Sequence, residues 1–94
     1  MMTDALPDDA KPRLPRGVRL RHYDVRNEWH LLAPERVVQA NGPAVEILKR
    51  CDGERTLATI VDDLSAAFAA DRALIDRDVR ALLADLIAKR MVDV

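Results

Sequence analysis

The chain has 94 residues, a formal net charge of −1 and a charged fraction of 33% in which the two signs are interspersed. This length predicts one domain, and the near-neutral balance excludes a field strong enough to attract nucleic acid or an anionic membrane. A single cysteine excludes an internal disulfide framework. No run reaches the roughly 18 apolar residues of a membrane span, and no signal-peptide segment is present, so we expect a cytoplasmic protein.

The first stretch of the chain is polar and interrupted by prolines, namely Pro7, Pro12 and Pro15. Neither a helical nor a strand period survives this spacing. Residues 1–16 are therefore predicted to form a disordered tail or linker, and the domain is expected to span residues 17–94.

Three short strands are predicted next. Residues 18–23 alternate between apolar and polar side chains, which is the period of a strand. A turn at residues 24–27 joins them to a second strand over residues 28–32. Pro34 ends that strand because proline has no N–H to donate. Residues 36–40 are short and β-branched, which favours a third strand.

The first helix is expected to follow the third strand almost directly. Asn41 is a suitable N-cap and Pro43 suits the first turn, where a backbone N–H is not missed. The helix is predicted to run from about Pro43 to Cys51. Gly53 can adopt the left-handed conformation that ends a helix.

Two further amphipathic helices complete the predicted fold. Thr56 is the expected N-cap of the second helix, whose apolar stripe runs over residues 57–68. The third carries a stripe over residues 75–87, with acidic residues near its start and Lys89 and Arg90 at its end, as the helix dipole favours. The order predicts an α+β domain: a small three-stranded antiparallel sheet followed by a three-helix bundle, similar to a winged helix.

No set of residues predicts catalysis. His22 and His30 lie on the two strands of the predicted hairpin, and Cys51 is a third possible ligand, but their spacing matches no zinc signature. A small buried side chain explains Cys51. The glycines stand apart, so there is no phosphate-binding loop. We therefore expect a protein that is not an enzyme and needs no cofactor.

The third strand predicts a binding function. A small open sheet has an edge with free N–H and C=O groups, and a partner peptide can add a strand there. DNA binding through the third helix is an alternative, because a winged helix can read DNA in this way. The charge distribution disfavours it: Arg77 and Arg80 are offset by Asp76 and Asp78.

The pattern of residues resembles the PqqD family of pyrroloquinoline quinone (PQQ) biosynthesis over about Leu14 to Val94. The matching pieces are Trp29, Leu31-Leu32-Ala33-Pro34-Glu35, Asn41, Ile47-Leu48, Cys51-Asp52-Gly53, Thr56, Ile60-Val61, Leu64, Asp78-Val79, Leu82-Leu83 and Leu86. Each piece is short, and together they are distributed over nearly the whole domain.

This resemblance implies a non-catalytic peptide chaperone. Proteins of this kind bind the precursor peptide PqqA and present it to PqqE, a radical-SAM enzyme that cross-links a Glu and a Tyr of that peptide. The fold is the prototype of the RiPP recognition element, in which the leader peptide adds beside the third strand, in the groove between that strand and the third helix. The implied peptide-binding residues are Arg36, Val37, Val38, Gln39, Ala40, Asp76, Val79, Arg80, Leu82, Leu83 and Leu86.

The resemblance leaves one further alternative open. PqqD-like domains are also found fused to another enzyme of the pathway, so this domain could instead stabilise a larger enzyme and bind no peptide. The proline-containing stretch at residues 1–16 is compatible with such a connection. The oligomeric state and the direction of a bound peptide do not follow from the sequence.

Overall fold

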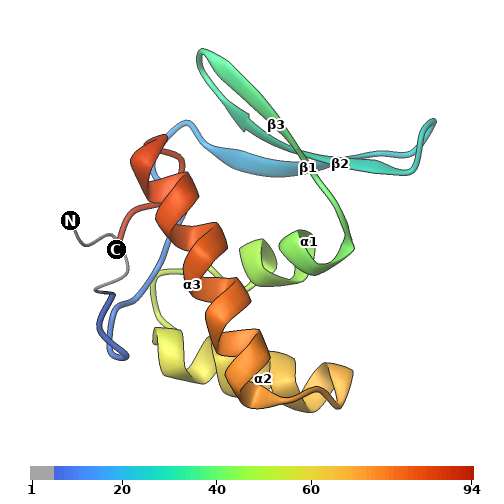
Figure 1. Cartoon of the computed structure of the whole chain (residues 1–94). Helices are drawn as coiled ribbons and strands as arrows, with labels where there is room; N and C mark the ends of the chain where they lie inside the picture. Colours follow the sequence, from blue (N-terminus) through green and yellow to red (C-terminus); the bar gives the residue numbers. More distant parts are fainter. Residues whose placement is uncertain (1–5) are drawn as a thin grey trace.

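The structure, a computed structural model, describes residues 6–94 and has three strands followed by three helices. The elements are β1 (Arg19–Tyr23), β2 (Glu28–Ala33), β3 (Arg36–Ala40), α1 (Gly42–Lys49), α2 (Leu57–Phe68) and α3 (Arg72–Ala88). The strands form one antiparallel sheet in the order β1-β2-β3, so β1 and β3 are its edges. The helices lie on one side of this sheet (Figure 1). The predicted α+β, winged-helix-like arrangement is therefore confirmed.

The two faces of the sheet differ because successive side chains of a strand point to opposite sides. Leu31 and Val38 are cross-strand neighbours on the face that packs against the core, where Leu31 is completely buried. On the same face, the Lys49 ammonium group lies 4.9 Å from the centre of the Trp29 ring, so the end of α1 covers that ring. Val37 alternates to the opposite face and is 62% exposed.

The first two helices begin close to the predicted positions, but only one of the two predicted side-chain caps forms. The hydroxyl of Thr56 accepts a hydrogen bond of 3.1 Å from the Thr59 N–H, which confirms the predicted cap of α2. Asn41 precedes α1 but makes no side-chain cap bond, so that part of the prediction is wrong. The last helical residue of α1 is Lys49 rather than Cys51.

Both ends of α3 differ from the prediction. The helix begins before residue 75, because the Asp71 carboxylate accepts a hydrogen bond of 3.0 Å from the Ala73 N–H and caps the first turn. At the other end the Met91 N–H donates to the Leu86 carbonyl at 2.8 Å, and Arg90 has a left-handed φ of 62°. This is a Schellman motif, in which the position taken by Arg90 is usually glycine.

One core joins the helices to the inner face of the sheet. No polar or charged residue is buried in the part of the chain that the structure describes, and no helix there is long and apolar enough to cross a membrane. Burial of this apolar surface is the main source of stability. The buried hydrophobic residues of this core are Leu31, Ala40, Val45, Ile47, Leu48, Cys51, Leu57, Ile60, Val61, Leu64, Val79, Leu83, Leu86, Met91 and Val92.

Residues 6–16 pack against α2 and the C-terminal residues instead of forming the predicted tail. The Leu57 N–H donates to the Ala10 carbonyl at 2.7 Å, and Arg13 exchanges two backbone hydrogen bonds with Asp93, at 2.8 and 2.9 Å. The prolines exclude a helix here, but they permit an extended segment whose remaining backbone groups bond to the domain. The prediction of disorder is wrong for this segment, and residues 1–5 lie outside the described part.

Arg80 on α3 fixes the start of this segment. Its guanidinium donates to the Leu6 carbonyl and the Asp8 carboxylate, and also to Asp76 at 3.0 Å. These contacts join residues far apart in the sequence, and several donors of one guanidinium are used together.

Replacing Arg80 with glutamine is expected to release this contact. The Ala58 N–H, which donates to the Asp8 carbonyl at 3.0 Å, should then exchange with solvent about tenfold faster, because local opening costs less. Arg77→Gln is the matched control, since Arg77 lies on the same helix and its ion-pair partner among residues 6–94 is its neighbour Asp78. Hydrogen exchange of the Ala58 amide is measured by NMR in both variants. Equal exchange rates in the two variants would contradict the role of Arg80.

Candidate functional site

β3 offers a sheet edge that is unpaired in the described part of the chain. One side of β3 pairs with β2, and no backbone hydrogen bond within residues 6–94 is made to its other side. Residues 34–35 form a two-residue turn between Ala33 and Arg36, which face each other in the register. In a hairpin of this length the flanking pair exchanges both of its hydrogen bonds.

This register decides which backbone groups are free. Hydrogen-bonded and non-hydrogen-bonded pairs alternate along an antiparallel ladder. Arg36, Val38 and Ala40 therefore direct their N–H and C=O groups towards β2. Val37 and Gln39 direct theirs towards the open edge. A peptide that adds to β3 meets the donors and acceptors of these two residues.

The side chains of β3 follow the same alternation. Ala40 is buried and Val38 is half-buried, and both pack against the core. Arg36 shares their face but is exposed, because it lies beyond the core at the start of the strand. The inner side of the edge therefore changes from charged to apolar along β3.

Three of the predicted groove residues on α3 are core residues. Val79, Leu83 and Leu86 are only 1%, 0% and 2% exposed, and of the three Val79 lines the apolar hollow between the helices. Leu83 and Leu86 therefore do not form an exposed wall beside β3 as predicted, whereas a contact of Val79 with the peptide stays a prediction. Leu82 is half-buried at the margin of the core and is the apolar residue of the predicted set that α3 presents at the surface.

Asp76 and Arg80, the other two predicted residues of α3, are engaged elsewhere. Both belong to the contact that holds the N-terminal segment through Leu6 and Asp8. Both side chains hold the N-terminal segment in this structure, and their role at the rim of a peptide groove stays a prediction.

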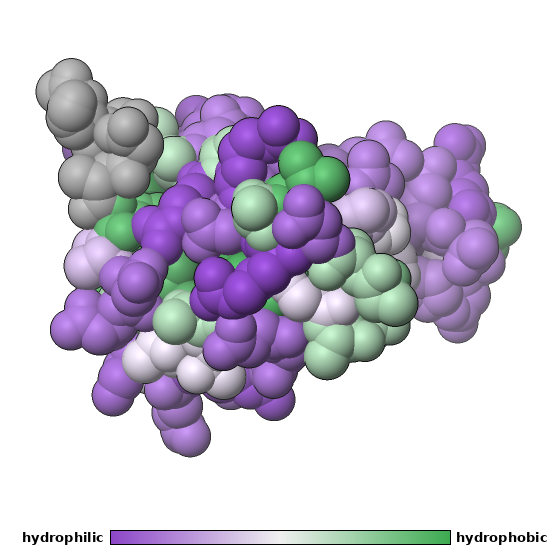
Figure 2. All heavy atoms as spheres, turned by 60° about the horizontal axis from the view of Figure 1, so that its bottom comes forward, coloured by the Kyte–Doolittle hydropathy of each residue, from purple (hydrophilic) through white to green (hydrophobic). Residues whose placement is uncertain are grey.

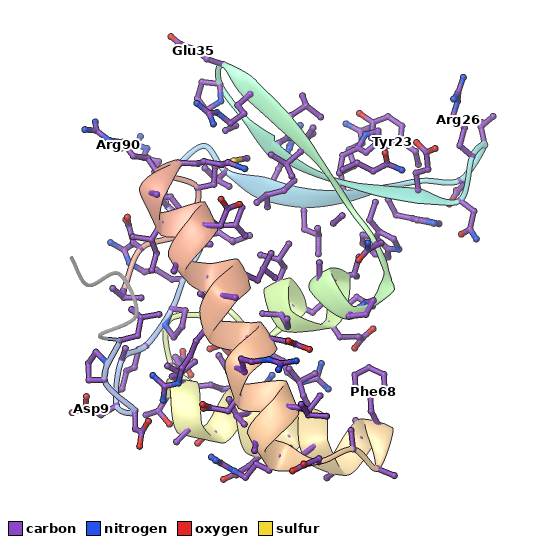
Figure 3. All side chains as sticks on the ribbon, viewed as in Figure 1. Asp9, Tyr23, Arg26, Glu35, Phe68 and Arg90 are labelled. Carbon is purple, nitrogen blue, oxygen red and sulfur yellow. The ribbon has the colours of Figure 1, made fainter. Side chains whose placement is uncertain are left out.

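An apolar hollow of about 200 Å³ lies between α1, the end of α2 and the start of α3. Phe68 at its edge is 51% exposed and projects from the end of α2 (Figure 3). The surface is largely hydrophilic, with apolar residues exposed near the connection from α2 to α3 (Figure 2). The lining residues of this apolar hollow are Pro43, Ile47, Leu64, Phe68, Ile75, Asp78 and Val79.

Sequence reasoning missed the apolar hollow. Phe68 and Ile75 lie on the apolar stripes of their helices and were therefore interpreted as core. Both stand near helix ends, where the neighbouring helix no longer covers them. Pro43 follows β3 closely in the chain, so the hollow lies beyond the Ala40 end of the strand.

A basic hollow of about 420 Å³ lies at the opposite end of β3. It separates the turn between β2 and β3 from the end of α3, where Figure 3 labels Glu35 and Arg90. The lining residues of this basic hollow are Ala33, Pro34, Glu35, Arg36, Lys89, Arg90 and Met91.

The arginines of α3 do not form a basic row suited to DNA. Each pairs with a carboxylate, so their charges are locally neutralised. A helix that reads DNA needs cations available for phosphate contacts. The pairs are Arg72–Asp62 at 2.5 Å, Arg77–Asp78 at 3.4 Å and Arg80–Asp76 at 3.0 Å.

The possible metal ligands named from the sequence do not converge. In the register His22 faces Trp29 and Arg21 faces His30, so the two histidines point to opposite faces of the sheet. Cys51 is buried just after the end of α1, and its thiol donates to the Ile47 carbonyl at 3.4 Å. Within residues 6–94 there is no group of three or more His, Cys, Asp or Glu residues able to hold a metal ion.

Burial makes Cys51 unreactive. It raises the pKa of the thiol from an ordinary value of 9.0 to about 12, and only the thiolate is a nucleophile. We expect the folded protein to resist a disulfide reagent such as DTNB at pH 8 and to react promptly in denaturant. Because the pKa is higher in the folded state, stability should fall as pH rises from 9.0 towards about 12. Rapid modification of the folded protein would contradict this environment.

Known sequences resemble the chain over most of its length. Residues 28–92 match the family described as "Coenzyme PQQ synthesis protein D (PqqD)". A "PqqA binding protein" of Rhodopseudomonas palustris is 48% identical over 85 residues, which cover 90% of this chain and 83% of that protein. A "Bifunctional coenzyme PQQ synthesis protein C/D" of Methylorubrum extorquens is 46% identical over 82 residues, 87% of this chain but only 22% of that protein.

Two solved structures share the fold. The solution NMR structure of the PqqD truncation of Methylobacterium extorquens PqqCD, described as a functional, stand-alone RiPP recognition element, has a TM-score of 0.84 and 42% identity, with full coverage of both chains. The crystal structure of PqqD from Xanthomonas campestris has a TM-score of 0.61 and 41% identity, covering 96% of this chain and 100% of that one. These similarities confirm the resemblance seen in the sequence, and the chain belongs to the PqqD family.

Proposed function

We propose that this protein is a non-catalytic peptide chaperone of PQQ biosynthesis that binds the precursor peptide PqqA by strand addition at β3. The observation that carries the proposal is the open edge of β3, where Val37 and Gln39 direct their backbone groups away from β2. Relatives of high identity are named as PqqA-binding proteins, which supports the choice of peptide.

Binding of this kind combines backbone and side-chain recognition. The outward N–H and C=O groups of Val37 and Gln39 supply hydrogen bonds that do not depend on the peptide's sequence. Leu82 and the apolar hollow supply surface for the peptide's apolar side chains. Each such side chain contributes roughly 1.5–3 kcal/mol when it is fully buried, so one or two of them select an apolar segment.

The second part of the proposal is that the bound peptide is presented to PqqE. A free precursor peptide samples many conformations, and ordering it costs entropy. A carrier that holds the leader segment and also docks on the enzyme raises the local concentration of the reacting segment. The protein therefore acts without catalytic groups of its own.

Association with another enzyme of the pathway is compatible with this role. In the Methylorubrum extorquens protein a matching domain forms part of a longer bifunctional chain. The N-terminal segment of the present chain packs on the side of α3 that carries Arg80. A covalent or non-covalent neighbour held near this segment would leave the edge of β3 available.

The test is calorimetric titration of the protein with the PqqA peptide of Rhodopseudomonas palustris. We expect saturable binding with one peptide per chain, and no binding of a peptide with the same composition in scrambled order. Addition of PqqE to the complex should then give a ternary complex. Binding of duplex DNA in place of PqqA would favour the alternative function, and absence of PqqA binding would overturn the proposal.

A further inference from the structure

The basic hollow contains two arginines that have no ion-pair partner within residues 6–94, namely Arg36 and Arg90. Its third cation, Lys89, pairs with Asp85 at 2.9 Å. Glu35 belongs to the lining, but its side chain is directed outward from the tip of the hairpin (Figure 3). Two arginines without an ion-pair partner among the described residues therefore line the hollow beside the start of β3.

The backbone of Arg90 gives a second reason to assign a role to this residue. Its φ of 62° lies in the left-handed region, at the helix-terminating position where glycine is most favourable. Folding alone thus favours glycine here. An arginine in a disfavoured conformation, with no ion pair among the described residues, points to a binding role for its charge.

The two ends of β3 differ in charge. Arg36 begins the strand at the basic hollow. Ala40 ends it next to the segment that leads to the apolar hollow, where Asp78 is the charged residue in the lining. An extended peptide beside β3 would meet cations at one end and apolar surface with a carboxylate at the other.

We propose that Arg36 and Arg90 form a subsite for a carboxylate side chain of the bound peptide and thereby set the peptide's direction. This inference rests on the strand addition proposed above. The peptide runs antiparallel to β3, as the neighbouring strand β2 does, because antiparallel pairing is the more stable geometry. Its Asp or Glu residue then follows its apolar residues in sequence.

Strand geometry fixes the number of residues between the apolar side chain and the acidic side chain of the peptide. Successive residues of a strand advance by about 3.3 Å, and Arg36 and Ala40 lie at the two ends of β3 on the same face. The acidic residue should therefore come about four to six residues after the apolar side chain that enters near Ala40. A peptide in the reverse direction would place its carboxylate at the apolar hollow, away from both arginines, and would lose this charge pairing.

The test is a set of titrations with the PqqA peptide of Rhodopseudomonas palustris and with variants in which each acidic residue is changed in turn to its amide. One amide variant should bind the wild-type protein about two- to fivefold more weakly. On a protein carrying both Arg36→Gln and Arg90→Gly, this amide variant should bind no more weakly than unmodified PqqA binds the same protein. Such a double-mutant cycle isolates the interaction between the carboxylate and the two arginines.

Arg90→Gly separates binding from folding. It removes the charge at a position where glycine suits the backbone, so thermal stability should be kept or increased while PqqA affinity falls about two- to fivefold. Arg90→Lys keeps the charge and should restore most of the affinity at low salt. Raised salt should reduce the difference between wild type and Arg90→Gly.

The outcomes distinguish this inference from the proposed function. If PqqA binds at β3 but the arginine variants bind it with wild-type affinity, or if the sensitive acidic residue precedes the apolar segment, the carboxylate subsite is wrong and strand addition stands. If PqqA fails to bind the wild-type protein, both proposals fall. Coupling of one acidic residue with Arg36 and Arg90 supports the subsite.

Discussion

Replacing Val37 with proline is expected to weaken PqqA binding by about tenfold or more while the domain stays folded. The variant removes the N–H that Val37 directs to the open edge, and a lost hydrogen bond of about 1 kcal/mol adds to the clash of the proline ring with an added strand. Proline is tolerated on an edge strand where the N–H faces solvent. Calorimetric titration with PqqA measures the loss, and circular dichroism checks the fold.

Two neighbouring variants serve as controls for Val37→Pro. Val37→Thr keeps the N–H and the β-branched shape, so its affinity should stay within about twofold of wild type. Val38→Pro removes an N–H that points to β2 and should instead destabilise the sheet. If folded Val37→Pro binds PqqA with wild-type affinity, the peptide does not pair with this edge.

Replacing Leu83 with alanine is expected to lower the free energy of unfolding by about 2–5 kcal/mol. Leu83 is completely buried between the helices, so the smaller side chain loses burial and leaves a cavity. Urea denaturation followed by circular dichroism measures the change. For a domain of this size, the loss is a large fraction of the total stability.

Leu82→Ala is the matched variant on the next residue of α3. Leu82 is half-buried at the margin of the core, so its truncation should cost only about 1 kcal/mol of stability. It should nevertheless weaken PqqA binding if Leu82 belongs, as proposed, to the apolar surface that the peptide contacts. The reverse pattern, with Leu82→Ala strongly unfolded and Leu83→Ala stable, would contradict the orientation of α3 in the structure.

The sequence was sufficient to predict the elements and their order. Alternation over residues 18–23 and the apolar stripe over residues 57–68 are local patterns, and each directly reports which face an element buries. The N-terminal segment was mispredicted because its partners are distant in sequence. Ala10 bonds to Leu57, and Arg13 bonds to Asp93, so no local pattern predicts that it is ordered.

The candidate site could be predicted only in part. Residues 36–40 were expected to form an edge strand, but which of their N–H groups face outward depends on the length of the turn before Arg36. The apolar stripe of α3 likewise does not distinguish Leu82 from Leu83, because coverage by other elements decides burial. Arg90 was expected inside the last helical turn, and its left-handed conformation appears only with the bond from Met91 to Leu86.

Hydrogen exchange of the β3 amides, measured by NMR with and without saturating PqqA, tests the central proposal most directly. The Val37 and Gln39 amides face the open edge and should exchange rapidly in the free protein, whereas the Val38 amide, directed to β2, should already be protected. Strand addition predicts that PqqA slows exchange at Val37 and Gln39 and leaves Val38 nearly unchanged. Saturation with PqqA that leaves Val37 and Gln39 exchanging as fast as in the free protein would contradict binding at this edge.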